Sequence, residues 1–301
     1  MNTLLSAMFC ALSVLLGAAA GSSLAQTATP PAPTSGGKLS GHIDVVSRYY
    51  LRGITTTYDN GTPLGNVGAD APESDRPALQ WGADYAHSSG FYLGYFGAQI
   101  NYSYQQLEAA WADRSVSVFQ KPRSIENDLS AGYTGAAGGL NYTVGGTYYL
   151  YINGRTSNAF ETKLGISQGP WALSAQTLLK DVVWGNKGDT YWSLVHTQAL
   201  PYDIALTVNL GYYTYKREGK YLGTVDTLSG TPCPAGTAFV VNGCFNGAQP
   251  AARGFRHLVV GLSQPIAATS LQWGVQLIFA GKNRYGVSQG HRAAFSLGYG
   301  F

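Results

Sequence analysis

The sequence predicts an all-β protein: a closed, antiparallel, up-and-down transmembrane β-barrel of about twelve strands. Charged residues are 12% of the 301 residues, about half the share in a soluble domain, whereas glycine (39) and tyrosine (21) are abundant. Apolar and polar side chains alternate in many short segments after residue 38, as they do in strands with two different faces. The mean hydropathy of -0.05 excludes a bundle of membrane helices, each of which needs about twenty apolar residues.

The N-terminal residues have the pattern of an export signal. Leu4–Ala20 is apolar, and Ser23-Leu24-Ala25 has the small residues of a cleavage site. We expect residues 1–25 to be a signal peptide and residues 26–38, rich in Pro, Thr, Ser and Gly, to be a flexible periplasmic leader. Residues 39–301 would then form the barrel. One feature departs from the usual pattern, since no Lys or Arg precedes the apolar stretch. The alternative is an uncleaved membrane anchor.

Alternation of apolar and polar residues predicts where the strands lie. The eighth strand is ambiguous, because Trp192 with Leu194 and Tyr191 with Val195 compete for the lipid face. The predicted strands are 39–53, 78–87, 90–102, 125–134, 140–151, 159–167, 171–182, 190–198, 203–215, 255–263, 271–280 and 290–301.

Turns between the strands fix which side chains share a face. A two-residue turn at Ser88-Ser89 is predicted to pair Tyr85 with Tyr92. One face of that hairpin would carry Leu79, Trp81, Tyr85, Tyr92, Phe96 and Ile100. The apolar face of the next hairpin would carry Leu129, Tyr133, Leu140, Tyr142, Val144 and Tyr148.

The lengths of the connections support a membrane barrel. Connections after even-numbered strands are short, whereas those after odd-numbered strands include three long ones, 54–77, 103–124 and 216–254. Short periplasmic turns that alternate with longer extracellular loops are typical of outer-membrane barrels. This asymmetry and the even number of strands therefore favour a barrel with both ends of the chain in the periplasm.

The last strand has the pattern of an assembly signal. Phe295, Leu297, Tyr299 and Phe301 alternate with small or polar residues, and the chain ends on Phe301. Outer-membrane proteins end in such strands, which the barrel-insertion machinery recognises. The sequence therefore predicts the bacterial cell outer membrane as the location, with lipid and that machinery as partners.

The apolar face of the strands is expected to point outward. It is too large and aromatic to face water, whereas in lipid its Trp and Tyr side chains can lie at the membrane interfaces. The opposite face carries charged and polar side chains and many glycines, so the interior would be wet. A soluble, lipocalin-like barrel would need the reverse arrangement and about eight strands.

Several motifs resemble a known family. Residues 47–53, Ser-Arg-Tyr-Tyr-Leu-Arg-Gly, are similar to the opening strand of the TorF-like porins of proteobacteria. Further similarities lie at Pro77, Asp84-Tyr85, residues 90–94, Asp128 and Gly132-Tyr133. The resemblance implies an outer-membrane channel without an assigned substrate. The 216–254 loop does not match the family pattern.

Charged residues on the inward face are the candidate site. If the barrel closes in sequence order, a largely basic wall with Arg48, Arg52 and Arg292 faces a largely acidic wall. The transverse field of such a pore would orient dipolar solutes. The alternative is internal salt bridging that only fills the lumen. The candidate pore-lining residues are Asp44, Arg48, Arg52, Asp84, Glu126, Asp128, Glu161, Lys163 and Arg292.

Cys233 and Cys244 are expected to form a disulfide, because an exported protein passes through the oxidising periplasm. Closing their loop would contribute about 2–3 kcal/mol in the entropic account. Metal binding is the weaker alternative, because no histidine lies within the loop to complete a ligand set.

These features predict a porin-like channel for passive passage of small hydrophilic solutes, with no catalytic residue, cofactor or metal. A net charge of +3 without a basic run argues against nucleic acid. One alternative is a plugged structural or adhesive outer-membrane barrel. The other is an outer-membrane hydrolase, since residues 165–169 and 286–290 have the G-x-S-x-G pattern.

Overall fold

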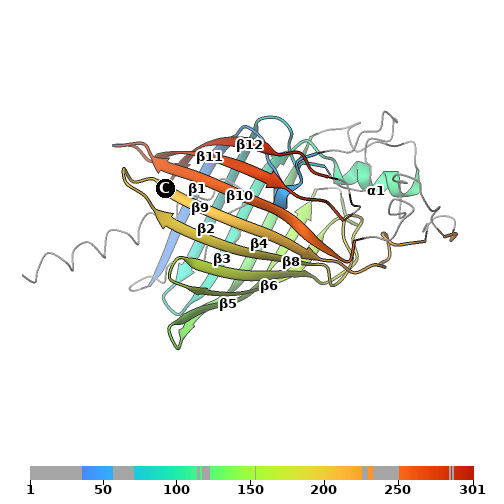
Figure 1. The fold of residues 1–301 in the computed structure, drawn as a ribbon, viewed down its shortest axis with the longest axis horizontal. Helices are drawn as coiled ribbons and strands as arrows, with labels where there is room; N and C mark the ends of the chain where they lie inside the picture. Colours follow the sequence, from blue (N-terminus) through green and yellow to red (C-terminus); the bar gives the residue numbers. More distant parts are fainter. Residues whose placement is uncertain are drawn as a thin grey trace, which may run out of the picture.

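The computed structural model describes residues 36–56, 71–113, 116, 123–152, 154–225, 230–232, 251–284, 286 and 288–301. These residues form a closed antiparallel barrel of twelve strands, in which each strand pairs with its sequence neighbours and β1 pairs with β12 (Figure 1). The predicted fold class is confirmed. The predicted signal peptide, nearly all of the leader and both loop cysteines lie outside the described residues.

Eleven of the predicted strands agree with the observed ones to within a few residues at each end. Among the described residues, no helix is long and apolar enough to cross a membrane. The elements are β1 (Gly37–Val46), the 3-10 turn η3 (Leu51–Gly53), β2 (Ala78–His87), β3 (Phe91–Ile100), α1 (Tyr104–Ala112), β4 (Ser124–Ala137), β5 (Leu140–Tyr151), β6 (Ala159–Gln168), β7 (Trp171–Leu178), β8 (Thr190–Ala199), β9 (Ala205–Thr214), β10 (Arg253–Pro265), β11 (Leu271–Ala280) and β12 (Arg292–Gly300).

The first strand differs from its prediction at both ends. It starts two residues earlier, where Gly37 pairs with His87, so the end of the expected leader belongs to the barrel. It ends at Val46 rather than at residue 53. The chain then turns away from the wall through Arg52 (φ 48°) and Gly53 (φ 73°), both in the left-handed region that no strand residue adopts.

The hairpin of β2 and β3 has a different register from the predicted one. Its connection has three residues, Ser88 to Gly90, because Gly90 takes a φ of 97° and donates its N–H to the His87 carbonyl at 2.9 Å. Tyr85 therefore pairs with Leu93 instead of Tyr92. This shift of one residue turns Tyr92, Phe96 and Ile100 to the inside, whereas the next hairpin has the predicted outward face.

Large apolar side chains cover the outer surface. Aliphatic residues occupy the middle of the strands, and aromatic residues lie nearer both ends, as in the interfacial girdles of membrane barrels. In the ambiguous strand β8, Trp192 is 40% exposed and Tyr191 only 4%, so Trp192 faces outward. Among the outward-facing aromatic residues are Tyr133, Trp171 and Tyr299 near the short turns and Phe160, Trp192 and Phe279 near the other end.

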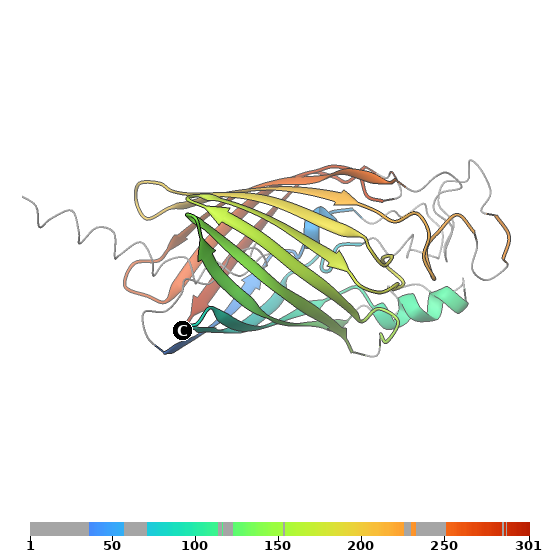
Figure 2. The ribbon, with the colours of Figure 1, turned by 90° about the horizontal axis from the view of Figure 1, so that it is seen from below.

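The two ends of the barrel are different. The short turns, among them residues 88–90, 138–139 and 169–170, lie at the end where the chain terminates. The described parts of the long connections and α1 lie at the opposite end, as Figures 1 and 2 both show. We call this the loop end. The predicted asymmetry of the connections is therefore confirmed for the described residues.

Candidate functional site in the barrel lumen

A segment of the chain folds into the lumen near the loop end. It comprises residues 47–56, which follow β1, and we call it the inward segment. Its first part pairs with the next connection, since Tyr49 and Ser74 exchange two backbone hydrogen bonds at 2.8 and 3.1 Å. Its last part is held from the other side, where Gln289 Oε1 accepts the backbone N–H groups of Thr55 and Thr56, both at 3.0 Å.

Arg52 is the centre of the hydrogen bonds between this segment and the opposite wall. Its Nη1 and Nη2 donate to the two carboxylate oxygens of Glu161 on β6 at 2.9 and 2.6 Å. Both side chains are buried, so the pair lies in a region of low dielectric. The guanidinium also donates to Tyr213 Oη on β9 (2.9 Å), Tyr149 Oη on β5 (3.0 Å) and Gln176 Oε1 on β7 (3.3 Å), and lies 4.7 Å from the Tyr191 ring centre on β8.

The backbone of the inward segment is also fixed by β10. Arg256 Nε donates to the Arg52 carbonyl at 3.0 Å, and His257 Nε2 lies 2.9 Å from the Tyr191 hydroxyl. A Cβ atom on Gly53 would lie 2.6 Å from His257 Cβ, and one on Gly211 would lie 2.3 Å from His257 Nε2. The histidine therefore fits only because glycine occupies both neighbouring positions.

Beside this network lies a group of buried carboxyl side chains. Glu126 and Asp128 are inward residues of β4, and Glu73 comes from the connection before β2. Tyr151 donates to Glu126 Oε1 at 3.1 Å and Tyr104 donates to Glu73 Oε1 at 2.7 Å. Burial, and the like charge of Glu126, hold the pKa of Glu73 well above its ordinary value. Among the described residues, no acidic, histidine or cysteine cluster has an arrangement that could hold a metal ion.

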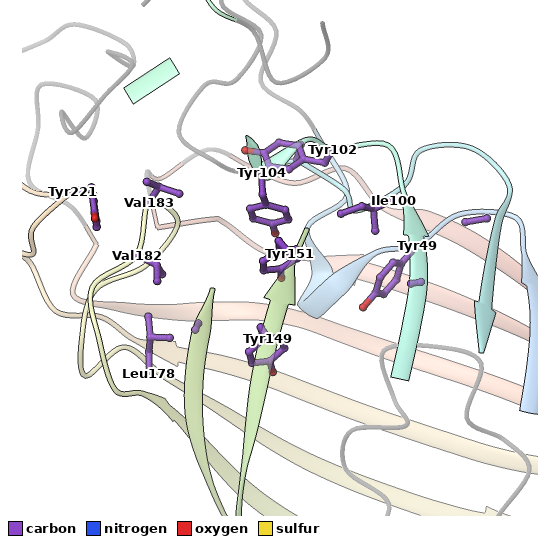
Figure 3. Close-up of a cluster of buried hydrophobic side chains, with 14 of the residues drawn as sticks. Tyr49, Ile100, Tyr102, Tyr104, Tyr149, Tyr151, Leu178, Val182, Val183 and Tyr221 are labelled. Atoms are coloured by element: carbon purple, nitrogen blue, oxygen red, sulfur yellow. The ribbon is translucent and has the colours of Figure 1, made fainter. Parts of the chain in front are cut away.

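Aromatic rings pack around these carboxyl groups. Tyr104 stacks on Tyr151 with ring centres 3.6 Å apart, and Tyr102 contacts Tyr104 edge to face. Figure 3 shows these tyrosines and several aliphatic side chains gathered where the strands meet the loops. The lumen is therefore packed at the loop end.

A second ion pair lies closer to the loops. Arg284 Nη1 donates to Asp189 Oδ2 at 2.6 Å, and both side chains are buried. The backbone N–H groups of Asn186 and Lys216 also donate to the Asp189 carboxylate, at 2.8 and 2.7 Å. The Arg284 guanidinium lies 5.0 Å from the ring centre of Tyr215.

The half of the lumen near the short turns is lined by further charged side chains and by glycine. Asp44 accepts from His42 Nδ1 at 2.5 Å on the same strand. Asp84 and Lys163 lie on the inner face by register, on β2 and β6. Much of the remaining inner face is glycine, including Gly82, Gly94, Gly132, Gly145 and Gly165.

The structure does not bring Arg48 and Arg292 together with Arg52, although Arg292 pairs with Ile278 and so keeps an inward position of β12. Arg48 and Arg292 are exposed, and the Arg292 guanidinium donates to the neighbouring His291 carbonyl at 3.0 Å. The predicted cluster of Arg48, Arg52 and Arg292 is therefore wrong. The physical reason is that β1 and β12 pair only over His42–Val46 and Ser296–Gly300, so Arg292 lies beyond the paired region and Arg52 has left the wall.

The predicted basic and acidic walls also do not form. Arg52 crosses the lumen and pairs with Glu161, which is the internal salt bridge of the alternative interpretation. The inward positions of Asp44, Asp84, Glu126, Asp128, Glu161 and Lys163 agree with the alternation from which they were predicted.

Several important residues could not be selected from the sequence. Tyr149, Tyr191 and Tyr213 alternate inward in their strands, but inward tyrosines carry no charge signal. Glu73 and Asp189 lie in connections, where no periodicity indicates a direction. Between the inward segment and the wall remains a cavity of about 80 Å³. Its lining includes Arg52, Tyr149, Glu161, Trp184, Tyr213 and Arg284.

The architecture defines the class of protein. A closed antiparallel barrel with an even number of strands, an apolar outer band, a polar lumen and its long connections at one end is an outer-membrane β-barrel. The chain belongs to the Gcw_chp family, described as bacterial proteins of unknown function, whose model matches residues 30–249. That match does not confirm the resemblance to the TorF-like porins.

Solved structures with a similar course of the chain are outer-membrane proteins. Phospholipase A from Escherichia coli is 11% identical, with 89% of this chain and 98% of that chain covered and a TM-score of 0.37. OmpF of Salmonella typhi in complex with daunomycin is 11% identical (88% and 97% covered, TM-score 0.36), and OprD of Pseudomonas aeruginosa is 12% identical (76% and 60%, TM-score 0.32). At these values the likeness identifies no activity. No curated protein sequence matches the chain.

Proposed function

We propose that this protein is a porin-like outer-membrane channel for passive passage of small hydrophilic solutes, closed in the described conformation by the inward segment. The observation that carries the proposal is the position of Arg52, which is held across the lumen by polar contacts to the opposite wall. A segment that is bound in this way can move without unfolding the barrel, because residues 48–56 lie outside the paired strands that close it.

The energetics of the closed state favour a reversible contact. The desolvation cost of a buried ion pair offsets much of its Coulomb attraction, so the Arg52–Glu161 pair contributes little net stability. Arg52 is also held at a φ of 48°, which costs a non-glycine residue about 1 kcal/mol. The ion pair therefore makes the attachment of the inward segment specific without adding much to its strength, as a gate requires.

The rest of the lumen is suited to hydrophilic solutes. Glycine at inward positions of β2 to β6 makes room for inward side chains, since a Cβ atom on Gly82 would lie 2.4 Å from His42 Nε2 and one on Gly132 would lie 2.5 Å from the Tyr92 hydroxyl. The side chains that make this wall polar are His42, Asp44, Asp84 and Lys163. Once the inward segment moves, a solute would meet a polar surface along the barrel. The wall can exchange hydrogen bonds with such a solute in place of water.

A plugged structural barrel is the second candidate. It is favoured by the close packing at the loop end, where Tyr49, Tyr102 and Tyr151 are all at most 3% exposed. If this packing is permanent, the inward segment is a plug and no solute passes. The hydrolase alternative rests only on two G-x-S-x-G patterns, whose serines are Ser167 at the end of β6 and Ser288 in an exposed connection.

Single-channel recording in a planar lipid bilayer tests the proposal. We expect brief openings of the wild-type protein and a much larger open fraction for Arg52→Ala, which loses every side-chain contact to the opposite wall. Arg48→Ala is the matched control, because this exposed arginine lies four residues away on the same segment. A wild type and an Arg52→Ala variant that both fail to conduct would instead support the plugged barrel. Release of fatty acid from phospholipid by the folded protein would support the hydrolase.

A further inference from the structure

The cavity beside Arg52 has a polar wall on which two of the three guanidinium groups are paired with carboxylates. Arg52 pairs with Glu161 and Arg284 pairs with Asp189, with a shortest distance of 2.6 Å in each pair. The third guanidinium on the wall, that of Arg256, donates to the carbonyls of Arg52 and Lys282 at 3.0 and 3.4 Å. The remaining acid on the wall is Glu73, whose raised pKa favours its neutral form.

This pairing acts against a charged occupant. An anion at Arg52 or Arg284 would have to displace Glu161 or Asp189, and one at Arg256 would have to take the place of the carbonyls of Arg52 and Lys282. A cation would have to displace a guanidinium from its carboxylate. Opening either ion pair leaves a buried protein charge without its partner, which is strongly unfavourable. A zwitterion such as an amino acid would have to open both kinds of pair. A neutral solute disturbs neither.

The groups that remain available on the wall suit hydroxyl groups. The Glu161 carboxylate accepts two hydrogen bonds from Arg52 and one from Tyr149, and a carboxylate has about four acceptor positions. The Tyr213 hydroxyl accepts from Arg52 and keeps its own O–H as a donor. A hydroxyl group can both donate and accept, so it matches either position without carrying charge.

Aromatic rings supply the other half of the lining. Tyr213 and Tyr215 lie parallel, with ring centres 4.8 Å apart and an angle of 4° between the rings, and Trp184 packs edge to face against Tyr149 at 6.3 Å. Flat rings next to hydrogen-bonding groups complement molecules whose C–H faces are apolar and whose edges carry hydroxyls. A dry cavity of about 150 Å³ accommodates benzene, so about 80 Å³ has room for a glycerol-sized group.

We infer that this cavity is a binding site for a neutral, hydroxyl-bearing solute, either a small polyol or one end of a sugar. The inference deepens the proposed function, since such a molecule would be the solute that the channel admits. The site lies against the Arg52 network, so an occupant would contact the gate directly.

Saturation-transfer NMR on the folded barrel in detergent tests the inference, because it measures binding and requires no current. The probes are xylitol, glycine and acetate. We expect xylitol alone to give a saturable signal with the wild type. Ala71→Leu should lower xylitol affinity by at least about tenfold, because it puts a larger side chain into the cavity without changing its charge. Ala252→Leu in an exposed connection is the control.

Asp189→Asn gives a second, independent test. It removes the carboxylate partner of Arg284, so we expect this variant to bind acetate, which a loss of structure alone would not produce. Folding of every variant is checked by its heat-dependent migration on a gel. If Ala71→Leu does not fold, the gain of acetate binding by Asp189→Asn tests the inference in its place.

The outcomes separate the inference from the channel proposal. Tighter binding of glycine or acetate than xylitol by the wild type would overturn the inference. So would unchanged xylitol affinity in folded Ala71→Leu, or Asp189→Asn that folds but does not bind acetate. Xylitol binding without any conductance would uphold the site and contradict the channel. Conductance without xylitol binding would uphold the channel and contradict the site.

Discussion

Arg52 and Glu161 form a two-point ion pair across the lumen, at 2.9 and 2.6 Å, although 109 residues separate them in the sequence. Glu161 belongs to the wall, whereas Arg52 belongs to a segment that has left it. The pair therefore joins a segment outside the barrel wall to the wall itself.

Removing one member of this pair should destabilise the protein more than removing both. Glu161→Met leaves the Arg52 guanidinium buried without its carboxylate, which costs about 3–5 kcal/mol if the segment stays in place. Arg52→Met with Glu161→Met replaces the pair by apolar side chains of similar length and should be close to the wild type. Urea unfolding of the barrel in detergent, followed by tryptophan fluorescence, measures the difference. Equal losses for the single and double variants would show that the two charges do not interact.

Gly53→Ala should open the channel. A Cβ atom at this position would lie 2.6 Å from His257, and the φ of 73° is unfavourable for alanine, so the inward segment must move. Gly286→Ala is a close control, because Gly286 has a φ of 78° but no atom within 4 Å of the added Cβ. We expect single-channel recording to show a larger open fraction for Gly53→Ala than for Gly286→Ala. Equal behaviour would mean that contact with His257 does not hold the segment closed.

The strands of the barrel could be predicted because the pattern that produces them lies within each short stretch of sequence. An apolar–polar pattern with a period of two residues predicts from the sequence alone that Leu129 and Tyr148 face outward. Contact with lipid imposes the same pattern on every strand. The β2–β3 register could not be fixed in this way. It depends on Gly90 adopting a positive φ, which adds one residue to the turn, and the alternating pattern is equally regular in either register.

The lumen was less predictable, because its arrangement depends on contacts between residues distant in sequence. Residues 47–53 alternate as a strand does, yet they leave the wall because Gly53 fits against His257 and Arg52 reaches Glu161. Both partners lie more than one hundred residues away. The inward direction of Glu161 could be predicted from its strand, but its partner could not.

Closure should weaken as the pH rises. In the closed state the pKa of Glu73 is raised by burial and by Glu126. A carboxyl group with a raised pKa contributes its full stability below its ordinary pKa, about 4.3, and loses it as the pH passes through the raised value. The open fraction should therefore increase with pH in bilayer recordings. Glu73→Gln should flatten this dependence, whereas Asp75→Asn, which changes an exposed acid two residues away, should leave it unchanged.

Deleting Phe301 should impair assembly more than Ser296→Ala. Phe301 is 70% exposed on the lipid side, exchanges backbone hydrogen bonds with Gly41 at 2.8 and 3.0 Å, and places its ring where a Gly41 Cβ would be, 2.6 Å from the ring atoms. Its loss removes both the last contacts between β12 and β1 and the aromatic end of the expected assembly signal. Ser296 lies on the inner face of the same strand and pairs with Val46, so its hydroxyl is outside that signal. The measurement is the yield of heat-modifiable barrel in outer-membrane fractions. Equal yields for the two variants would show that the barrel assembles without recognition of its last residue.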